Sequence, residues 1–156
     1  MWIENCAADD IPKAFHHDAG PNSMLIQITD PASWRPTPKH TFKEIHHFEF
    51  LDIDDLDQPD DPEMFISEDQ AKELVRLLRH AYDNKMNVVV HCFAGVSRSA
   101  AIAEVGIQMG FQEVEKFRSP NSRVMRLMMA ELGLPYDVKE HNWREDYRKY
   151  LGAKFE

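Results

Sequence analysis

Short apolar runs alternate along the chain with longer segments in which apolar residues recur every three or four positions. Four of the short runs predict strands, at residues 2–3, 24–28, 47–51 and 88–90. The last run is Val88-Val89-Val90, a continuous β-branched stretch of the kind that suits a strand buried on both faces of a sheet.

The longer segments predict helices. Residues 67–81 begin with Ser-Glu-Asp-Gln, the pattern of a capping box, and continue with apolar residues at a 3.6-residue spacing. Residues 100–109 and 122–132 are each followed by a glycine, a common end of a helix. A last helix is expected at residues 138–151.

These elements predict an α/β fold. We expect a single domain of residues 1–156, with a central, mostly parallel sheet of four to five strands flanked by helices. The chain length and a composition of 43% hydrophobic and 29% charged residues are those of an ordinary globular domain. The proline-rich residues 31–38 are expected to form an extended surface connection, with the alternative that Trp34 and Arg35 line a substrate groove.

The formal net charge of −9 is distributed unevenly. Residues 1–63 carry 14 acidic and 4 basic residues, whereas residues 64–156 carry 13 acidic and 14 basic ones. An acidic chain is not expected to bind nucleic acid or an anionic membrane surface as its main activity. A site that handles phosphate is therefore expected in the second part.

The cysteine content and the N-terminus suggest a compartment. Cys6 and Cys92 are the only cysteines, so we expect neither a disulfide framework nor a four-cysteine zinc site, and a reducing, cytoplasmic location. The N-terminal residues lack a basic start and an apolar run, and no stretch approaches about 18 consecutive apolar residues. Neither secretion nor a membrane span is expected.

The segment with the clearest chemistry is residues 91–99, His-Cys-Phe-Ala-Gly-Val-Ser-Arg-Ser. It leaves a predicted buried strand and enters a predicted helix, and five residues separate Cys92 from Arg98. Such a loop can turn successive backbone N–H groups inward and form a nest for a phosphate-sized anion. Gly95 supplies the backbone freedom for the curl, and Arg98 can donate two parallel hydrogen bonds to phosphate oxygens.

The same loop can activate the cysteine. A helix N-terminus and a neighbouring arginine typically lower the pKa of a cysteine thiol to about 3.5–7.5, which would make Cys92 a thiolate nucleophile at neutral pH. A cysteine alone is often only a small buried hydrophobic residue. The combination of His91, Gly95, two serines and the strand–loop–helix context makes the phosphate-binding interpretation specific.

Residues 88–101 resemble the signature of the cysteine-dependent protein tyrosine phosphatase superfamily, and the core Ala-Gly-Val-Ser-Arg-Ser is similar to that of its dual-specificity branch. Residues 118–121, Arg-Ser-Pro-Asn, are similar to the segment that follows the loop helix in that branch. The predicted strand at residues 48–52 resembles the one that ends at the family's general acid. The resemblance covers roughly residues 44–132, and the chain length is similar to that of short bacterial and viral members.

The resemblance implies a hydrolase that forms a phosphocysteine intermediate and uses no metal or other cofactor. Cys92 would attack the phosphoester, while loop N–H groups and Arg98 stabilise the phosphate oxygens. Ser99 would donate a hydrogen bond to the departing thiolate. His91 and Asn121 would support the loop, and Asn121 has the alternative role of capping a helix. The residues implied to bind the substrate phosphate are Phe93, Ala94, Gly95, Val96, Ser97 and Arg98.

The same chemistry needs a carboxylic acid that protonates the leaving oxygen and then activates water. By its position just past the predicted strand, where the family has its aspartate, Asp52 is the first candidate and Asp55 the alternative. The shorter spacing of common family members points instead to Asp60 or Asp61, so choosing Asp52 implies a longer loop. The other carboxylates of this segment are Glu49, Asp54, Asp57 and Glu63.

The remaining histidines and cysteine suggest two further kinds of site. The histidine pairs at residues 16–17 and 46–47 are poor chelates, because adjacent residues do not share a helix face and point to opposite sides of a strand, so no metal site is predicted. A redox-reversible disulfide between Cys6 and Cys92 that protects the nucleophile is a separate hypothesis.

The predicted activity is hydrolysis of phosphotyrosine, with phosphoserine and phosphothreonine as further substrates, in a phosphorylated protein or peptide partner. One alternative is a phosphoinositide or RNA 5′-phosphate phosphatase on the same scaffold. Residues 93–97 contain no Lys or Arg to meet additional phosphates, which argues against it. A second alternative is a phosphoprotein-binding module without turnover. The sequence assigns no oligomeric state.

Overall fold

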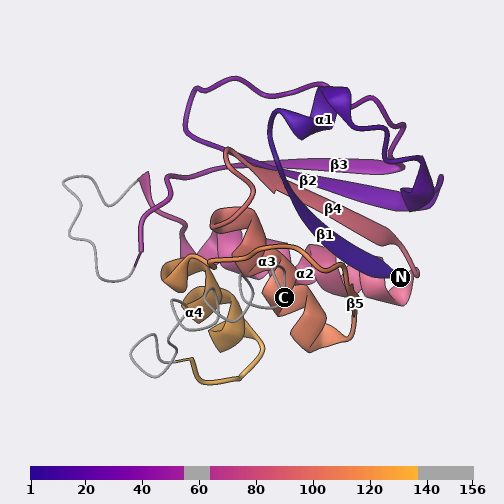
Figure 1. The fold of residues 1–156 in the computed structure, drawn as a ribbon. Coiled ribbons are helices and arrows are strands. Elements are labelled where there is room, and N and C mark those ends of the chain that lie inside the picture. The colour runs from indigo at the N-terminus through magenta and orange to yellow at the C-terminus, as the bar shows by residue number, and fades with distance from the viewer. Residues whose placement is uncertain (55–63, 137–156) are drawn as a thin grey trace, which may run out of the picture.

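The buried valine run lies at the centre of a parallel sheet. The computed structural model describes residues 1–54 and 64–136, in which five strands pair in the order β3-β2-β4-β1-β5 (Figure 1). All of these pairings are parallel, so the predicted α/β fold with a central sheet is confirmed. The strands are β1 (Trp2–Ala7), β2 (Ser23–Thr29), β3 (Glu44–Glu49), β4 (Asn87–Cys92) and β5 (Gln112–Glu113).

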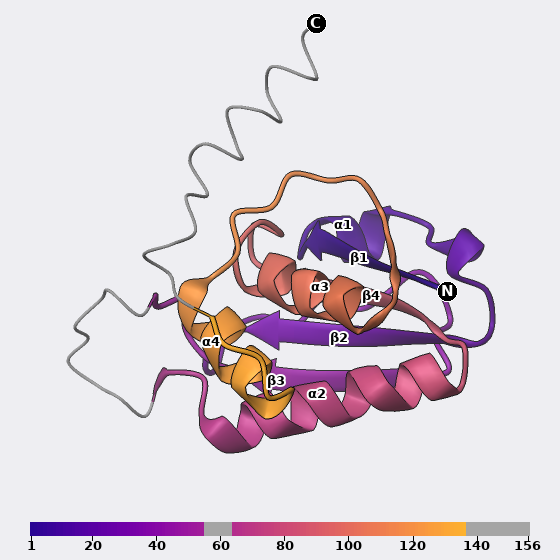
Figure 2. The same ribbon diagram turned by 90° about the horizontal axis from the view of Figure 1, so that it is seen from below.

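Helices cover both faces of this sheet. α2 (Glu68–Asp83), α3 (Arg98–Met109) and α4 (Ser122–Glu131) lie on one face, and the short α1 (Asp10–Lys13) lies on the other, as Figures 1 and 2 show. A 3₁₀ turn, η1 (His17–Ala19), follows α1. Because both faces are covered, β2 and the last five residues of β4 are buried, as their apolar sequences require.

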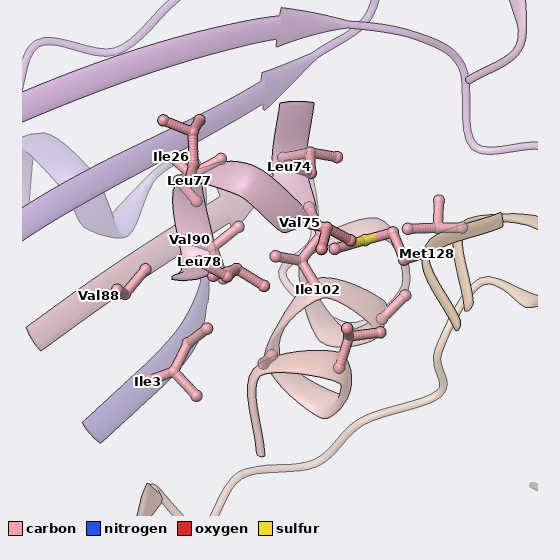
Figure 3. Packing of buried hydrophobic residues seen from close by; sticks show 14 of the residues in the cluster. Ile3, Ile26, Leu74, Val75, Leu77, Leu78, Val88, Val90, Ile102 and Met128 are labelled. Atoms are coloured by element: carbon pink, nitrogen blue, oxygen red, sulfur yellow. The ribbon is translucent and has the colours of Figure 1, made fainter. Parts of the chain in front are cut away.

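The main core lies between the sheet and the three longer helices. Side chains from β4 such as Val90 meet Leu78 of α2 and Ile102 of α3 in this layer (Figure 3). A smaller cluster on the opposite face contains Cys6, Ile11, Leu25 and Val89. Since neighbouring residues of a strand point to opposite faces, Val90 and Cys92 face the main core while Val89 and His91 face the smaller one.

The observed boundaries refine the predicted elements. The capping box is present, because the Ser67 hydroxyl accepts from Gln70 N–H and the Gln70 side chain accepts from Ser67 N–H. β3 is displaced towards the N-terminus of the predicted segment, because after it the chain leaves the strand and Leu51 N–H bonds to Met64 O. The short α1, η1 and β5 were not predicted. The helix expected at residues 138–151 lies outside the described residues.

The proline-rich residues 31–38 form no helix or strand, as predicted for a connection. The chain from β2 to β3 passes over the face of the sheet that carries α1, where Lys39 N–H donates to Ile11 O (Figure 1). The side chain of Gln27, in β2, binds this connection. Its Nε2 donates to Pro36 O at 2.8 Å, and its Oε1 accepts from Arg35 Nε at 2.7 Å. Within the described ranges, no helix has the length and apolar composition that a membrane span requires.

Candidate active site

The loop at residues 93–97 curls around Cys92, which ends the central strand β4. Gly95 has a φ of +79°, and its N–H donates to Cys92 Sγ at 3.3 Å. The hydroxyl of Ser99, in the first turn of α3, lies 3.1 Å from the same sulfur. Cys92 is 2% exposed. The thiol therefore lies at the base of the loop between two groups that can stabilise negative charge on sulfur.

The carbonyl oxygens of the loop are bonded to the surrounding chain. Asn5 of β1 donates from Nδ2 to Gly95 O at 2.7 Å. Three backbone bonds do the same: Ala8 N to Phe93 O (3.1 Å), Ser119 N to Val96 O (2.7 Å) and Asn121 N to Ser97 O (3.1 Å). With these four carbonyl oxygens bonded outward and the Gly95 N–H directed at Cys92 Sγ, the loop has the arrangement expected of an anion nest.

Arg98 begins α3 and is only 4% exposed. Its Nη1 donates to Asp30 Oδ1 at 2.6 Å and to Phe50 O at 2.8 Å, whereas its buried Nε has no hydrogen-bond partner among the described residues. A buried guanidinium requires partners for its N–H groups. An oxyanion bound in the loop would supply the missing acceptor.

Asp52 lies close to the loop and to the start of α4. Its Oδ1 accepts from Ser97 Oγ at 2.7 Å and from Asn121 Nδ2 at 2.8 Å. Asn121 also caps α4, because its Oδ1 accepts from Val124 N–H at 3.0 Å. Asn121 therefore makes both expected kinds of contact: it caps α4, and its backbone N–H donates to Ser97 O of the loop.

One pocket of about 400 Å³ unites the main candidates. It is lined by Cys92, Arg98 and Asp52, together with Asp30, Leu51, Ile53, Phe93, Ala94, Val96 and Ser97. Most of the loop predicted to bind phosphate therefore opens into the same space as the candidate nucleophile and the first candidate for the general acid. Gly95 is buried behind it. The alternative acid Asp55, with Asp57, Asp60, Asp61 and Glu63, lies outside the described residues.

His91 precedes the nucleophile candidate and is fully buried. Its Nδ1 lies 3.4 Å from Cys92 O, and no residue in the described ranges forms a hydrogen bond with its Nε2. Burial lowers the pKa of His91 to about 4, and the positive charges of Arg98 and Arg35 act in the same direction. His91 is therefore neutral at physiological pH and can support the loop only as an uncharged ring.

Cys6 cannot reach Cys92 with this backbone. In the pairing of β1 with β4, Cys6 is in register with His91 and Ala7 with Cys92, so the two sulfurs point to opposite faces of the sheet. Both cysteines are free thiols, and burial raises the pKa of Cys6 to about 12. The hypothesis of a protective disulfide between them is wrong for this fold.

The histidine pairs belong to other local contacts. His46 lies 3.1 Å from Glu44 Oε1, and His47 lies 2.7 Å from Thr29 Oγ1. Among residues 1–54 and 64–136, no three His, Cys, Asp or Glu side chains are grouped so that they could hold a metal ion.

Two residues of the site were missed by sequence reasoning. Asp30 directly follows β2, and the carboxyl ends of parallel strands meet at one edge of the sheet, so its position was a usable signal. Asn5 is a polar residue within a short strand and is 1% exposed. Its role depends on β1 pairing with β4, which no local pattern indicated.

The family is established by sequence comparison. The family model described as Protein-tyrosine phosphatase matches residues 28–130, more than half of the chain. The chain therefore belongs to the protein-tyrosine phosphatase family, and the resemblance seen at residues 88–101 is confirmed. No curated protein matches the chain by sequence.

Three solved structures align with the chain at low sequence identity. The human tyrosine phosphatase-like serine/threonine/tyrosine-interacting protein aligns with a TM-score of 0.51 and 17% identity over 96% of this chain and 93% of that one. Human DUSP28 aligns with a TM-score of 0.47 and 13% identity over 97% and 94%. The Orf virus tyrosine phosphatase OH1 aligns with a TM-score of 0.45 and 19% identity over 69% of this chain and 56% of OH1, so the match spans little more than half of OH1.

Proposed function

We propose that this protein hydrolyses phosphotyrosine, with phosphoserine and phosphothreonine as further substrates, in phosphorylated proteins or peptides. The observation that carries the proposal is the shared pocket of Cys92, Arg98 and Asp52. A nucleophile, a guanidinium and a carboxylic acid around one anion nest are the groups that phosphoryl transfer through a covalent intermediate needs.

In the first step, the Cys92 thiolate attacks phosphorus, so that an S–P bond forms while the P–O bond to the substrate breaks. The loop N–H groups and Arg98 stabilise the charge on the phosphate oxygens. Arg98 is pre-oriented for this role by its bonds to Asp30 and Phe50 O. Asp52 gives its proton to the leaving oxygen, which departs as the tyrosine hydroxyl.

In the second step, water attacks the phosphocysteine. The Asp52 carboxylate takes a proton from the water, and the S–P bond breaks to release inorganic phosphate. Ser99 donates a hydrogen bond to the departing thiolate, in line with the 3.1 Å between its hydroxyl and Cys92 Sγ. A free thiolate nucleophile suits a reducing compartment, so we place the protein in the cytoplasm.

The nucleophile is tested with Cys92→Ser, with Cys6→Ser as the matched control. We expect Cys92→Ser to lower hydrolysis of p-nitrophenyl phosphate and of a phosphotyrosine peptide by at least about 1,000-fold. Cys6→Ser, on the opposite face of the sheet, retains activity. Orthovanadate inhibits the wild-type protein, and EDTA does not. The measurement is phosphate release.

Three results would overturn this assignment. Equal activity of Cys92→Ser and wild type would show that Cys92 is not the nucleophile. Release from phosphoinositides or from RNA 5′-phosphates but from no phosphopeptide would show the alternative substrate class. Tight phosphopeptide binding without release would show a binding module.

The general acid is tested with Asp52→Asn, with Asp54→Asn as the matched control. Asp54 is a neighbouring carboxylate whose Oδ1 accepts from Ser122 N–H at 2.8 Å. We expect Asp52→Asn to lower kcat by about 100-fold and to remove the alkaline limb of the pH–rate profile, because the leaving oxygen then receives no proton from an acid. If Asp52→Asn keeps both limbs and loses less than about tenfold, another carboxylate acts, and Asp55 is the next to test.

A further inference from the structure

Two large aromatic side chains are exposed beside the candidate active site. Phe93, which directly follows Cys92, is 77% exposed, and Trp34, from the connection between β2 and β3, is 57% exposed. A second pocket of about 110 Å³ is lined by both rings, with the buried Ala8 and Ile28 also in its wall. Exposed apolar surface around a hollow marks a binding site more often than a scatter of single exposed residues does.

This second pocket adjoins the first. Phe93 and Asp30 line both, so a ligand with its phosphate at Cys92 passes directly beside the second pocket. Consecutive residues of an extended peptide advance by about 3.3–3.6 Å. A peptide side chain within two residues of a bound phosphotyrosine can therefore reach the second pocket.

The residues that line the second pocket indicate which kind of substrate side chain it can bind. The walls contain no cationic side chain, and the one carboxylate, Asp30, is already bonded to Arg98. The remaining polar lining residues, Thr29 and Ser33, are uncharged. An acidic side chain here would meet the Asp30 carboxylate and no cation among the lining residues, whereas an apolar side chain gains from leaving water.

We propose that the pocket between Trp34 and Phe93 receives a large apolar side chain that lies within two residues of the phosphotyrosine in the substrate. The protein thereby selects phosphopeptides with such a residue over otherwise identical ones. This inference rests on the proposed function for recognition of the phosphate at Cys92.

A lipid surface is a less suitable occupant of the same aromatic pair. Proteins that bury aromatic side chains in a bilayer surface commonly add Lys and Arg that attract anionic headgroups. Here residues 1–63, which include Trp34, carry 14 acidic and 4 basic residues. The nearest base in sequence, Arg35, is bonded to Gln27.

The test compares phosphotyrosine peptides in which leucine, alanine or aspartate stands at each of the two positions on either side. Two quantities are measured: kcat/KM with the wild-type protein, and Kd with the Cys92→Ser protein as a non-hydrolysing binder. At one of these positions we expect the leucine peptide to have about tenfold higher kcat/KM and about tenfold lower Kd than the alanine peptide, and the aspartate peptide to be the poorest. In Trp34→Ala, or in Cys92→Ser/Trp34→Ala for binding, the leucine and alanine peptides become about equal in both quantities.

Two variants act as controls. Trp34→Phe keeps an aromatic wall and keeps most of the preference. Phe15→Ala removes another exposed aromatic residue, 59% exposed and outside both pockets, and keeps the wild-type ratio. Hydrolysis of p-nitrophenyl phosphate, which has no flanking residues, measures the chemistry separately from the pocket.

The outcomes separate this inference from the proposed function. Phosphate release with equal leucine and alanine values overturns the inference alone. A leucine preference in Kd without phosphate release supports the pocket and overturns the proposed function. Absence of both phosphopeptide binding and release overturns both. Trp34-dependent binding to phosphatidylserine or phosphoinositide vesicles without any peptide preference overturns the inference alone.

Discussion

Arg98 shows how a single buried charge is stabilised in this site. Its side chain is 5% exposed, and its Nη1 has two acceptors from distant parts of the chain, Asp30 Oδ1 and Phe50 O. The Asp30 side chain is 49% exposed, so solvent weakens the charge interaction and the direction of the hydrogen bond counts for more. We therefore regard Asp30 as a residue that positions Arg98 and does not react itself.

This role predicts different effects for two substitutions of Asp30. Asp30→Ala removes the acceptor and is expected to lower kcat/KM for p-nitrophenyl phosphate by about tenfold or more, because the guanidinium loses its orientation. Asp30→Asn retains an oxygen acceptor and is expected to lose less than about threefold. Asp83→Ala, which removes an exposed carboxylate at the far end of α2, serves as the control. Wild-type kcat/KM in Asp30→Ala would refute the positioning role.

At the scale of elements, the loop at residues 93–97 packs closely against the end of β1. Gly95 adopts a left-handed φ of +79°, and a Cβ added there would lie 2.4 Å from the carbonyl carbon of Cys6 and 2.5 Å from Ala7 N. These are backbone atoms, which cannot move away as a flexible side chain can. Gly95 is thus required both by its conformation and by the close packing of the loop against β1.

Gly95→Ala is therefore expected to lower the free energy of unfolding by about 2–3 kcal/mol and to reduce phosphate release by at least about 100-fold. Gly133→Ala is the matched control, because Gly133 has a φ of +72° but, apart from its chain neighbours, no atom of the residues that the structure describes lies within 4 Å of an added Cβ. It is expected to cost about 1 kcal/mol from backbone strain alone. Urea unfolding gives both free energies, and equal losses would disprove the packing argument.

At the scale of the whole molecule, the buried His91 links stability to pH. Its pKa is about 4 in the folded protein and 6.5 in its ordinary state, so the unfolded chain binds a proton first as the pH falls. The contribution of the neutral ring is fully present above pH 6.5 and is lost between pH 6.5 and 4. The pKa of His47 is lowered too, by burial and by Arg35, and acts in the same direction.

The wild-type protein is expected to lose about 2 kcal/mol of unfolding free energy between pH 7 and pH 5 through His91 alone. In His91→Gln that part of the pH dependence disappears, although the variant is less stable at pH 7. Val89→Ala, a cavity-forming change on the same strand, lowers stability at both pH values without changing the slope. A wild-type slope in His91→Gln, measured by urea unfolding at the two pH values, would contradict this account.

Much of the fold was predictable because its signals are local. The β-branched run of β4, the capping box of α2 and the glycines after α3 and α4 act over a few residues each, and their elements appear near the predicted positions. The short β5 and α1 have too few residues for a periodic pattern, and their formation depends on packing against β1. The displaced β3 is an edge strand, for which one-sided pairing leaves the ends weakly specified.

The residues of the candidate site also form two groups, one predictable from the local sequence and one that depends on the tertiary structure. Cys92, Gly95, Arg98 and Ser99 lie within eight residues, so strand, loop and helix arrange them by local geometry, and their choice as candidates needs only the sequence. Asp30, Asn5 and the Trp34 wall of the second pocket come from other strands and connections. Their contacts follow from the strand order β3-β2-β4-β1-β5, which long-range packing selects. Local backbone geometry therefore determined the loop at residues 92–99, and tertiary packing decided its supports and its neighbouring pocket.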